Sequence, residues 1–330
     1  MLDAFNSNSF GVVALTEAIN KLPYHPGIIG AMGLFEDEGV PTTSIAVEER
    51  DGVIALVPNQ VRGGPAAVNL AVKRTLRNFN LLHLPMQDTV KADDVQGVRA
   101  FGSETAVDTI SGRVNDKMQS MKDALGVTHE HLMMGALKGE LLDADGSTSL
   151  LNLFTEFSLT QGTNDFALSV PTTKIRSICV GIARKIEAAL GSGVYSGIHA
   201  MVGSTFFDDL IDHEDVRAAY ERQSEGVNLR NDLRRGFTIF GVTFEEYRGT
   251  VGSVDFISKT TGIAFPTGVR GLYKMHYGPA DYIETVNTMG KPFYAKQDTQ
   301  KFDKGVDLEV QSNPLPIVTR PQVLQELTKS

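Results

Sequence analysis

The chain has 330 residues, of which 42% are hydrophobic, so it is long enough for one large or two ordinary domains with a sizeable core. This composition is globular and excludes a disordered or membrane-embedded chain. The formal net charge of −9 argues against tight sequence-specific DNA binding, which normally uses a basic surface, but it allows a wall that surrounds nucleic acid without reading it.

No membrane span or export signal is predicted. The longest apolar run, residues 27–35, is far shorter than the ~20 residues that a membrane span requires. The first residues carry an acid but no lysine or arginine, unlike a secretory signal. Cys179 is the only cysteine, which excludes an intrachain disulfide framework and favours a reducing cytosol. We interpret it as a small buried hydrophobic residue, because no histidine lies near it in the sequence to activate a thiol.

The first predicted element is a short amphipathic helix. Ser9 is a candidate cap, Pro23 is a stop, and the apolar residues between them fall at helical spacing: Val12, Leu15, Ile19 and Leu22. Residues 24–41 are rich in glycine and proline, and we interpret them as a linker whose apolar residues need a surface to cover; an ordinary surface loop is the alternative.

An extended segment follows. Residues 43–50 and 53–57 are predicted strands around Asp51-Gly52, a dipeptide suited to a tight hairpin turn. Farther on, the apolar residues Val68, Leu70, Val72 and Leu76 alternate with Asn69, Lys73, Thr75 and Arg77. If residues 67–84 stay extended, they reach roughly 60 Å at about 3.3 Å per residue. We predict an arm that needs a surface to lie on, because an isolated two-stranded ribbon is marginal in water.

The arm is locally basic in an acidic chain. Contact with phosphate groups is one interpretation, but Phe79 is the only aromatic residue nearby, so stacking on single-stranded nucleic acid is poorly supported. Pairing with an acidic patch on another copy is favoured, and candidate acidic residues are Glu36, Asp37, Glu38, Glu48 and Glu49. We predict inter-subunit contacts at Val57, Arg62, Val68, Leu70, Val72, Lys73, Arg74, Leu76 and Arg77.

The strongest helical pattern lies at residues 104–138. Its apolar stripe recurs at steps of three and four, at Val107, Ile110, Val114, Met118, Met121 and Leu125, and the charged residues, Lys122 among them, are placed elsewhere on the surface. Lys138-Gly139 supplies a stop. Such a helix would extend about 52 Å. We predict a spine that packs on a sheet along one side and leaves the other side in water.

The remainder has an α+β pattern without regular βαβ alternation. Strands joined by a turn at Asp145-Gly146 are predicted over residues 140–159. Helices are predicted at 173–190 and 215–223, and strands at 198–202, 237–242 and 243–247. The tail, residues 306–324, is extended, and Pro314 and Pro316 suit an edge or an ending.

Four motifs resemble sites for chemistry, and each has a simpler interpretation. The calcium-like loop at residues 143–147 has its glycine too early and favours a hairpin turn. His129 and His131 have the wrong spacing for zinc, and we interpret residues 129–131 as solvated polar residues. The glycines of residues 191–197 favour a helix end over a phosphate loop. The fourth motif is a cluster of acids that could bind a cation or, more simply, lie where the helix dipole favours negative charge: Asp208, Asp209, Asp212 and Asp215.

No nucleophile elbow, P-loop or recognisable histidine pattern is present. We therefore predict no catalytic residue, no cofactor, no metal site and no enzyme, with a metal-dependent enzyme using the acids at 208–215 as a distant alternative.

The order of these parts resembles the major capsid proteins of tailed bacteriophages, which have the Hong Kong 97-type fold, and in particular the lambda major head protein family. The resemblance rests on residues 56–64 (LVPNQVRGG), 137–142 (LKGELL) and 294–317 (YAKQDTQKFDKGVDLEVQSNPLPI). It covers essentially the whole chain.

The resemblance implies five parts: an N-terminal arm at 1–35, an extended loop at 36–88, a peripheral domain at 89–170 with the spine helix at 104–138, an axial domain at 171–289, and a return to the peripheral domain at 290–330. It implies self-assembly into pentamers and hexamers of an icosahedral shell around packaged double-stranded DNA, with maturation by expansion.

The implied partners are other copies, a portal, a scaffold or protease, and a decoration protein, but no membrane. The implied location is the virion, assembled in the bacterial host cytoplasm. A non-viral compartment of the encapsulin kind, which shares the fold, is the alternative shell.

Overall fold

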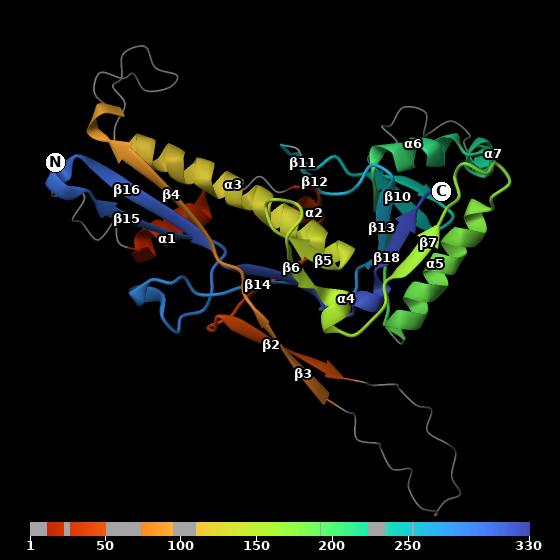
Figure 1. Ribbon diagram of the computed structural model, residues 1–330, viewed down its shortest axis with the longest axis horizontal. Coiled ribbons are helices and arrows are strands. Elements are labelled where there is room, and N and C mark those ends of the chain that lie inside the picture. The colour runs from red at the N-terminus through yellow and green to blue at the C-terminus, as the bar shows by residue number, and fades with distance from the viewer. Residues whose placement is uncertain are drawn as a thin grey trace, which may run out of the picture.

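The computed structural model describes residues 12–22, 27–50, 74–94, 110–191, 193–223, 234, 236–252 and 254–330. Figure 1 shows an elongated molecule in which the long helix α3 (Ile110–Lys138) leads from a three-stranded sheet to a larger sheet flanked by helices, while a narrow hairpin projects from its middle.

Helix α3 forms the predicted spine over its described length of 29 residues. It ends at Lys138, and Gly139 follows with a positive φ of 85°, which favours glycine. Residues 104–109 of the predicted helix lie outside the described residues. Its stripe is buried against the antiparallel sheet β15-β16-β4, made of β15 (Tyr294–Thr299), β16 (Gly305–Ser312) and β4 (Leu84–Lys91).

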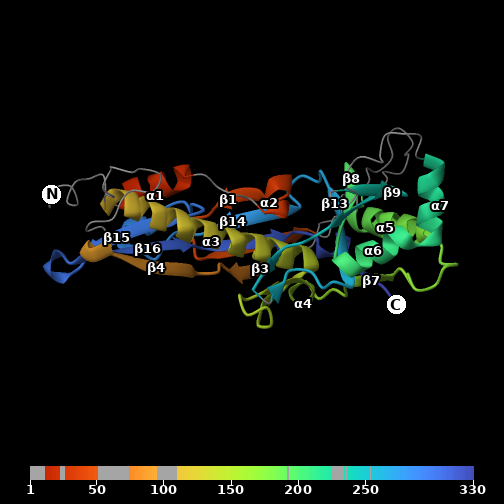
Figure 2. The same ribbon diagram turned by 90° about the horizontal axis from the view of Figure 1, so that it is seen from above.

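Helix α1 (Val12–Lys21) joins the same apolar cluster through Leu15 and Ile19. In Figure 2 the red helices α1 and α2 follow one another along the flank of α3, which both of them contact.

The predicted linker is in fact structured. Within residues 24–41 the chain forms α2 (Ile28–Met32) and β1 (Glu36–Gly39). Strand β1 pairs in parallel with β14 (Tyr273–Tyr277), which pairs antiparallel with β17 (Pro314–Val318). The prediction of a linker is therefore wrong, because contacts with distant segments give this glycine-rich stretch its structure. The expectation that its apolar residues cover a surface is confirmed, since Ile29 is fully buried in the main core. Pro314 and Pro316 lie in β17, an edge strand as predicted.

The larger sheet lies at the other end of the molecule. Its strand order is β7-β18-β13-β8-β10-β9. The strands are β7 (Gly162–Asp165), β18 (Gln325–Thr328), β13 (Thr261–Thr267), β8 (Gly197–Val202), β10 (Val242–Glu246) and β9 (Phe237–Ile239). The flanking helices are α5 (Ile175–Leu190), α6 (Ser204–Asp212) and α7 (Glu214–Gln223). The sheet thus includes β7 and β18, from outside residues 171–289.

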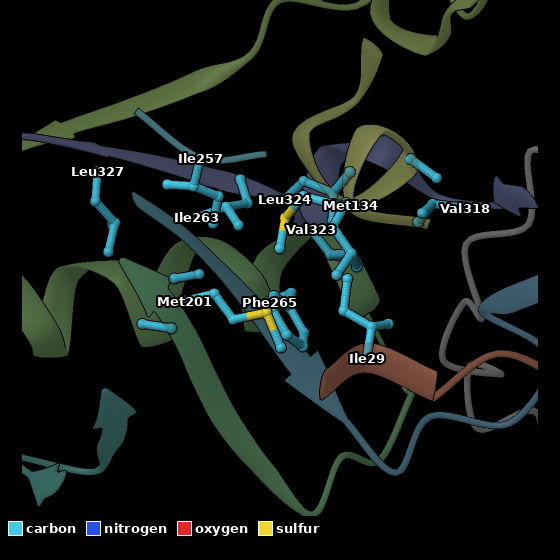
Figure 3. Packing of buried hydrophobic residues seen from close by; sticks show 14 of the residues in the cluster. Ile29, Met134, Met201, Ile257, Ile263, Phe265, Val318, Val323, Leu324 and Leu327 are labelled. Atoms are coloured by element: carbon cyan, nitrogen blue, oxygen red, sulfur yellow. The ribbon is translucent and has the colours of Figure 1, made fainter. Parts of the chain in front are cut away.

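A continuous core connects this sheet to the spine. Figure 3 shows Ile29 of α2 and Met134 of α3 in one cluster with Phe265 of β13 and the side chains around it. The larger sheet and the C-terminal part of α3 therefore share one apolar core, which is separate from the cluster beneath β15-β16-β4.

Two local predictions need correction. The sequence predicted one strand ending at residue 242 and the next starting at residue 243, and this boundary is wrong. The turn between the strands lies at Phe240-Gly241, where both φ angles are positive (51° and 83°), as a tight hairpin turn requires. Residues 140–159 form β5 (Glu140–Leu142) and β6 (Ser149–Asn152) as predicted, but then the helix α4 (Leu153–Glu156). Asn152 caps α4 by accepting a hydrogen bond from the Thr155 N–H. The short pair β11 (Thr250–Val251) and β12 (Val254–Asp255) completes the described strands.

The projecting hairpin consists of β2 (Ser44–Arg50) and β3 (Arg74–Asn80), paired antiparallel from Ser44↔Asn80 to Arg50↔Arg74. The strand predicted at 53–57 and its turn lie outside the described residues. The extended run predicted at 67–84 is broken within its described part: β3 ends at Asn80, and β4 starts at Leu84 in a different sheet.

Candidate assembly surface

The base of the β2–β3 hairpin is packed onto the body by the side chains of one face. Ile45 and Phe79 are register partners, and both are buried. The Phe79 ring stacks on Phe157, with centroids 5.9 Å apart and an interplanar angle of 25°. The guanidinium of Arg77 lies 5.3 Å from the same ring centroid and donates a hydrogen bond to the Glu156 carbonyl. The hairpin therefore leaves the body from an anchored base.

These contacts correct the predicted orientation of β3 at its base. The sequence pattern placed Arg77 on a polar, basic face for contact with another copy, whereas in the structure it faces Phe157 of its own copy. Phe79, two residues on, points the same way, as strand alternation requires.

The other predicted contact residues divide into two groups. Arg74 and Leu76 lie in β3, though only their backbone is described. Outside the described residues are Val57, Arg62, Val68, Leu70, Val72 and Lys73. The inter-subunit role of the whole set stays a prediction.

A buried carboxylate, which no sequence pattern had indicated, lies where α2 meets α3. Glu130 of α3 accepts hydrogen bonds from the backbone N–H groups of Ile29 (2.7 Å) and Gly30 (3.1 Å). Its carboxylate also accepts a hydrogen bond from the Tyr247 hydroxyl at 3.0 Å. A Cβ atom on Gly27 would lie 2.2 Å from Glu130 Cδ, so only glycine fits beside it. Glu130 thus begins α2 and ties it to the spine.

His129 is buried beside it, so the interpretation of residues 129–131 as solvated is wrong. Its ring stacks on Phe293 at 5.2 Å, and Nε2 lies 2.8 Å from Ser312 Oγ. The Ser312 hydroxyl donates to the Pro292 carbonyl, so His129 Nε2 is the donor in the other hydrogen bond. Burial lowers the pKa of His129 to about 4, which keeps the ring neutral at pH 7.

Lys122 was predicted to lie on the outer surface, but it is also buried, with 2% of its surface exposed. Its ammonium donates to the carbonyls of Ile19 (2.7 Å) and Leu22 (2.8 Å) at the end of α1, and lies 5.3 Å from the Phe293 ring centroid. Burial lowers the pKa of Lys122.

The helical spacing of the sequence could have predicted that Lys122 and His129 are buried. Steps of four and three from Met118 lead through Lys122, Leu125 and His129 to Leu132, so the polar residues lie within the apolar stripe.

The candidate sites for chemistry resolve into structural contacts. Asp209 pairs with Lys329, and the Asp215 carboxylate accepts from the Arg176 N–H at 3.3 Å. Over the described residues, no three or more His, Cys, Asp or Glu side chains are grouped to hold a metal ion. The acids at 208–215 lie among these residues and are not grouped in this way.

The other singled-out residues have the simpler roles that were predicted. Cys179 is buried, which raises the pKa of its thiol to about 12. Asp145 accepts from the Thr148 hydroxyl and from the N–H groups of Thr148 and Ser147, which lowers its pKa and forms the predicted turn. Helix α5 ends at Leu190, and Gly191 follows with φ 62°. Across the part of the chain that is described, no helix is long and apolar enough to cross a membrane.

Comparison with known proteins identifies the family. The model of the family described as phage major capsid protein E matches residues 11–329. The chain is 27% identical to the major capsid protein of Salmonella phage Felix O1, covering 99% of this chain and 98% of that protein. The major capsid protein of Pseudomonas phage KPP10 is also 27% identical, over 96% of each chain.

Solved capsids share the fold at lower sequence identity. The capsid of the cyanophage P-SCSP1u matches with a TM-score of 0.53 at 11% identity, covering 90% of this chain and 86% of that one. The capsid of a native GTA particle matches with a TM-score of 0.58 at 8% identity, covering 93% and 92%. The fold is therefore the Hong Kong 97-type capsid fold, as predicted. Because the family model and both relatives cover nearly the whole chain, this protein belongs to the phage major capsid protein E family and is a major capsid protein of tailed phages.

Proposed function

We propose that copies of this chain assemble as pentamers and hexamers into an icosahedral shell that encloses packaged double-stranded DNA. The observation that carries the proposal is the match to the capsid family over residues 11–329. The net charge of −9 supports a wall that lies near DNA without binding it tightly.

The projecting hairpin supports an assembly role. Its base is anchored by Phe79 on Phe157, so the strands hold a fixed direction where they leave the body. Residues 36–88 would act as an extended loop that lies across a neighbouring copy through the contact residues predicted above, apart from Arg77, which contacts Phe157 of its own copy. An interface of about 2,000 Å² or more is of obligate size, and contacts of one kind repeated around closed rings build a shell.

The finer assignments belong to the same proposal. Residues 89–170 and 290–330 would form the peripheral domain, and residues 171–289 the axial domain. A portal, a scaffold or protease, and a decoration protein would be partners, and assembly would take place in the host cytoplasm. A non-viral compartment is not favoured, because both curated relatives are phage major capsid proteins.

The hairpin register gives a sharp test. Arg50 and Arg74 are register partners, so residues 51–73 can be replaced by Asn-Gly, a two-residue turn that closes β2 onto β3. We expect this variant to fold, with a circular dichroism spectrum like that of the parent chain, and to form no shells in negative-stain images. The matched control replaces Asp145-Gly146, the turn between β5 and β6, by Asn-Gly. Normal particles from the shortened variant would overturn the role of the arm.

A further inference from the structure

The segment that joins β14 to β15 exposes a patch of large apolar side chains. Ile283 is 90% exposed, Val286 62% and Met289 60%. Ile283 and Val286 are three residues apart across a 3₁₀ turn, where side chains at this spacing lie over one another. We call these three residues the 283–289 patch. Exposing so much apolar surface on one short segment is costly unless another surface covers it.

The backbone beneath the patch is fixed by hydrogen bonds. The Thr285 hydroxyl lies 2.8 Å from the Ala280 carbonyl and 2.9 Å from the Tyr282 carbonyl, and the Thr288 hydroxyl donates to the Thr285 carbonyl at 2.7 Å. The Gly290 N–H donates to the Val40 carbonyl at 3.0 Å. A segment ordered before binding loses little entropy on binding, which is typical of interface anchors.

The surroundings of the patch are polar and partly anionic. Asp281 has a side chain that is 66% exposed, and Glu284 pairs with Lys296 at 3.1 Å. An apolar centre with a charged rim is the usual composition of a protein–protein interface.

We propose that the 283–289 patch is the docking site for residues 51–73 of a second copy of this chain. This inference rests on the proposed function. The segment carries the apolar Val68, Leu70 and Val72 for the centre of the patch, and the cations Arg62 and Lys73 for the exposed Asp281 at its rim.

The geometry favours a second copy over the same one. In Figure 1 the β14–β15 segment and the β2–β3 hairpin leave the same edge of the molecule, and β2 and β3 lead away from that segment. The far end of the hairpin, from which residues 51–73 continue, therefore points away from the patch of its own copy. Contact between two different surfaces of one chain is heterologous, which is the kind that closes rings.

Disulfide trapping tests the docking. Subunits carrying Val286→Cys are mixed with subunits carrying Leu70→Cys, assembled and oxidised with copper phenanthroline. Cys179 does not interfere, because it is buried. The control pair is Val194→Cys with Leu70→Cys, since Val194 is 84% exposed on a different part of the chain. We expect covalent dimers from the first pair to exceed those from the control about tenfold.

A second measurement keeps the test decisive if cysteine variants assemble poorly. Val286→Asp is expected to lower shell yield about tenfold relative to Val194→Asp, with both subunits folded by circular dichroism. Normal shells without excess crosslinking, equal yields from the two aspartate variants, or crosslinking of the Val286→Cys subunit to a different protein would overturn the docking site and leave the proposed function standing. Failure of the parent chain to form any shell would overturn the proposed function itself.

Discussion

The carboxylate of Glu130 connects three segments that are far apart in the sequence. It accepts the N–H groups that begin α2 and the hydroxyl of Tyr247. Glu130→Gln keeps the side-chain size but removes the charge and replaces one accepting oxygen by a donor. We expect the free energy of unfolding to fall by roughly 1.5–3 kcal/mol, the range for hydrogen bonds to a charged group, as measured by denaturant unfolding of unassembled subunits.

The matched control for this variant is Glu17→Gln, since Glu17 is exposed on α1. Equal unfolding midpoints for the two variants would show that Glu130 does not hold α2 in place.

His129 predicts a loss of stability in acid. Its pKa is about 4 in the folded chain and about 6.5 when unfolded. As the pH falls from 6.5 to 4, the unfolded chain binds a proton that the folded chain does not, so stability is lost across that window. His129→Gln removes this contribution. Comparing pH 7 with pH 5, we expect the variant to lose about 2 kcal/mol less stability than the parent chain.

His83→Gln is the control for the pH experiment, because the His83 side chain is 48% exposed. Denaturant midpoints measured at both pH values give the comparison. A parent-like pH dependence in His129→Gln would contradict the assignment of the buried, neutral ring.

Among the elements, the hairpin base is held by the stack of Phe79 on Phe157, together with Ile45 and Arg77. Phe79→Ala removes a buried ring that contacts Phe157, and truncation of a buried phenylalanine typically costs about 3–5 kcal/mol. Because the contact joins an edge element to the body, we expect the loss as local release of β2 and β3. Amide hydrogen exchange in Ser44–Arg50 is therefore expected to accelerate strongly, while α3 stays protected. Asn78→Ala, at an exposed position of the same strand, is the control, and equal exchange in both variants would contradict the anchor.

Elements with strong local periodicity were predictable from the sequence. The end of α3, nearly all of α5 and the strand β8 follow from apolar spacing and a glycine stop. Elements that depend on distant partners were not: α2 begins at the Glu130 carboxylate, about 100 residues away, and β1 exists by pairing with β14. The turn at Phe240-Gly241 carries no Asn-Gly or Asp-Gly signal, so its position was missed.

Dependence on distant partners also explains the wrong predictions at the candidate site. Lysine is usually exposed and histidine is only intermediate in burial, so Lys122 and His129 were placed in solvent despite their positions in the apolar stripe. Their partners, Leu22 and Ser312, are far away in the sequence and no short window shows them. The arm was predicted because an isolated two-stranded ribbon is marginal in water, which local sequence shows. The structure describes only the base of this arm, β2 and β3.

For the whole molecule, the charge of the arm opposes the charge of the chain. Copies with a net charge of −9 repel one another at long range, whereas Arg62, Lys73 and Arg74 gather positive charge on one segment. Contacts between this segment and carboxylates of other copies would speed assembly and weaken as salt screens them. Changing all three residues to glutamate moves the net charge by −6, from −9 to −15. We expect a yield of closed shells at least about tenfold lower at roughly 0.1 M salt.

The matched control for this charge reversal changes three exposed cations at or near α5, Lys174, Arg176 and Arg184, to glutamate. It gives the same net charge of −15, from −9 and −6, so general repulsion is equal in the two variants. If the position of the charge matters, the control gives a much higher yield of closed shells than the arm variant. The yield of the parent chain is then also expected to fall as the salt concentration rises. Equal yields from the two triple variants would assign the effect to net charge alone, and the arm would then act through its apolar residues.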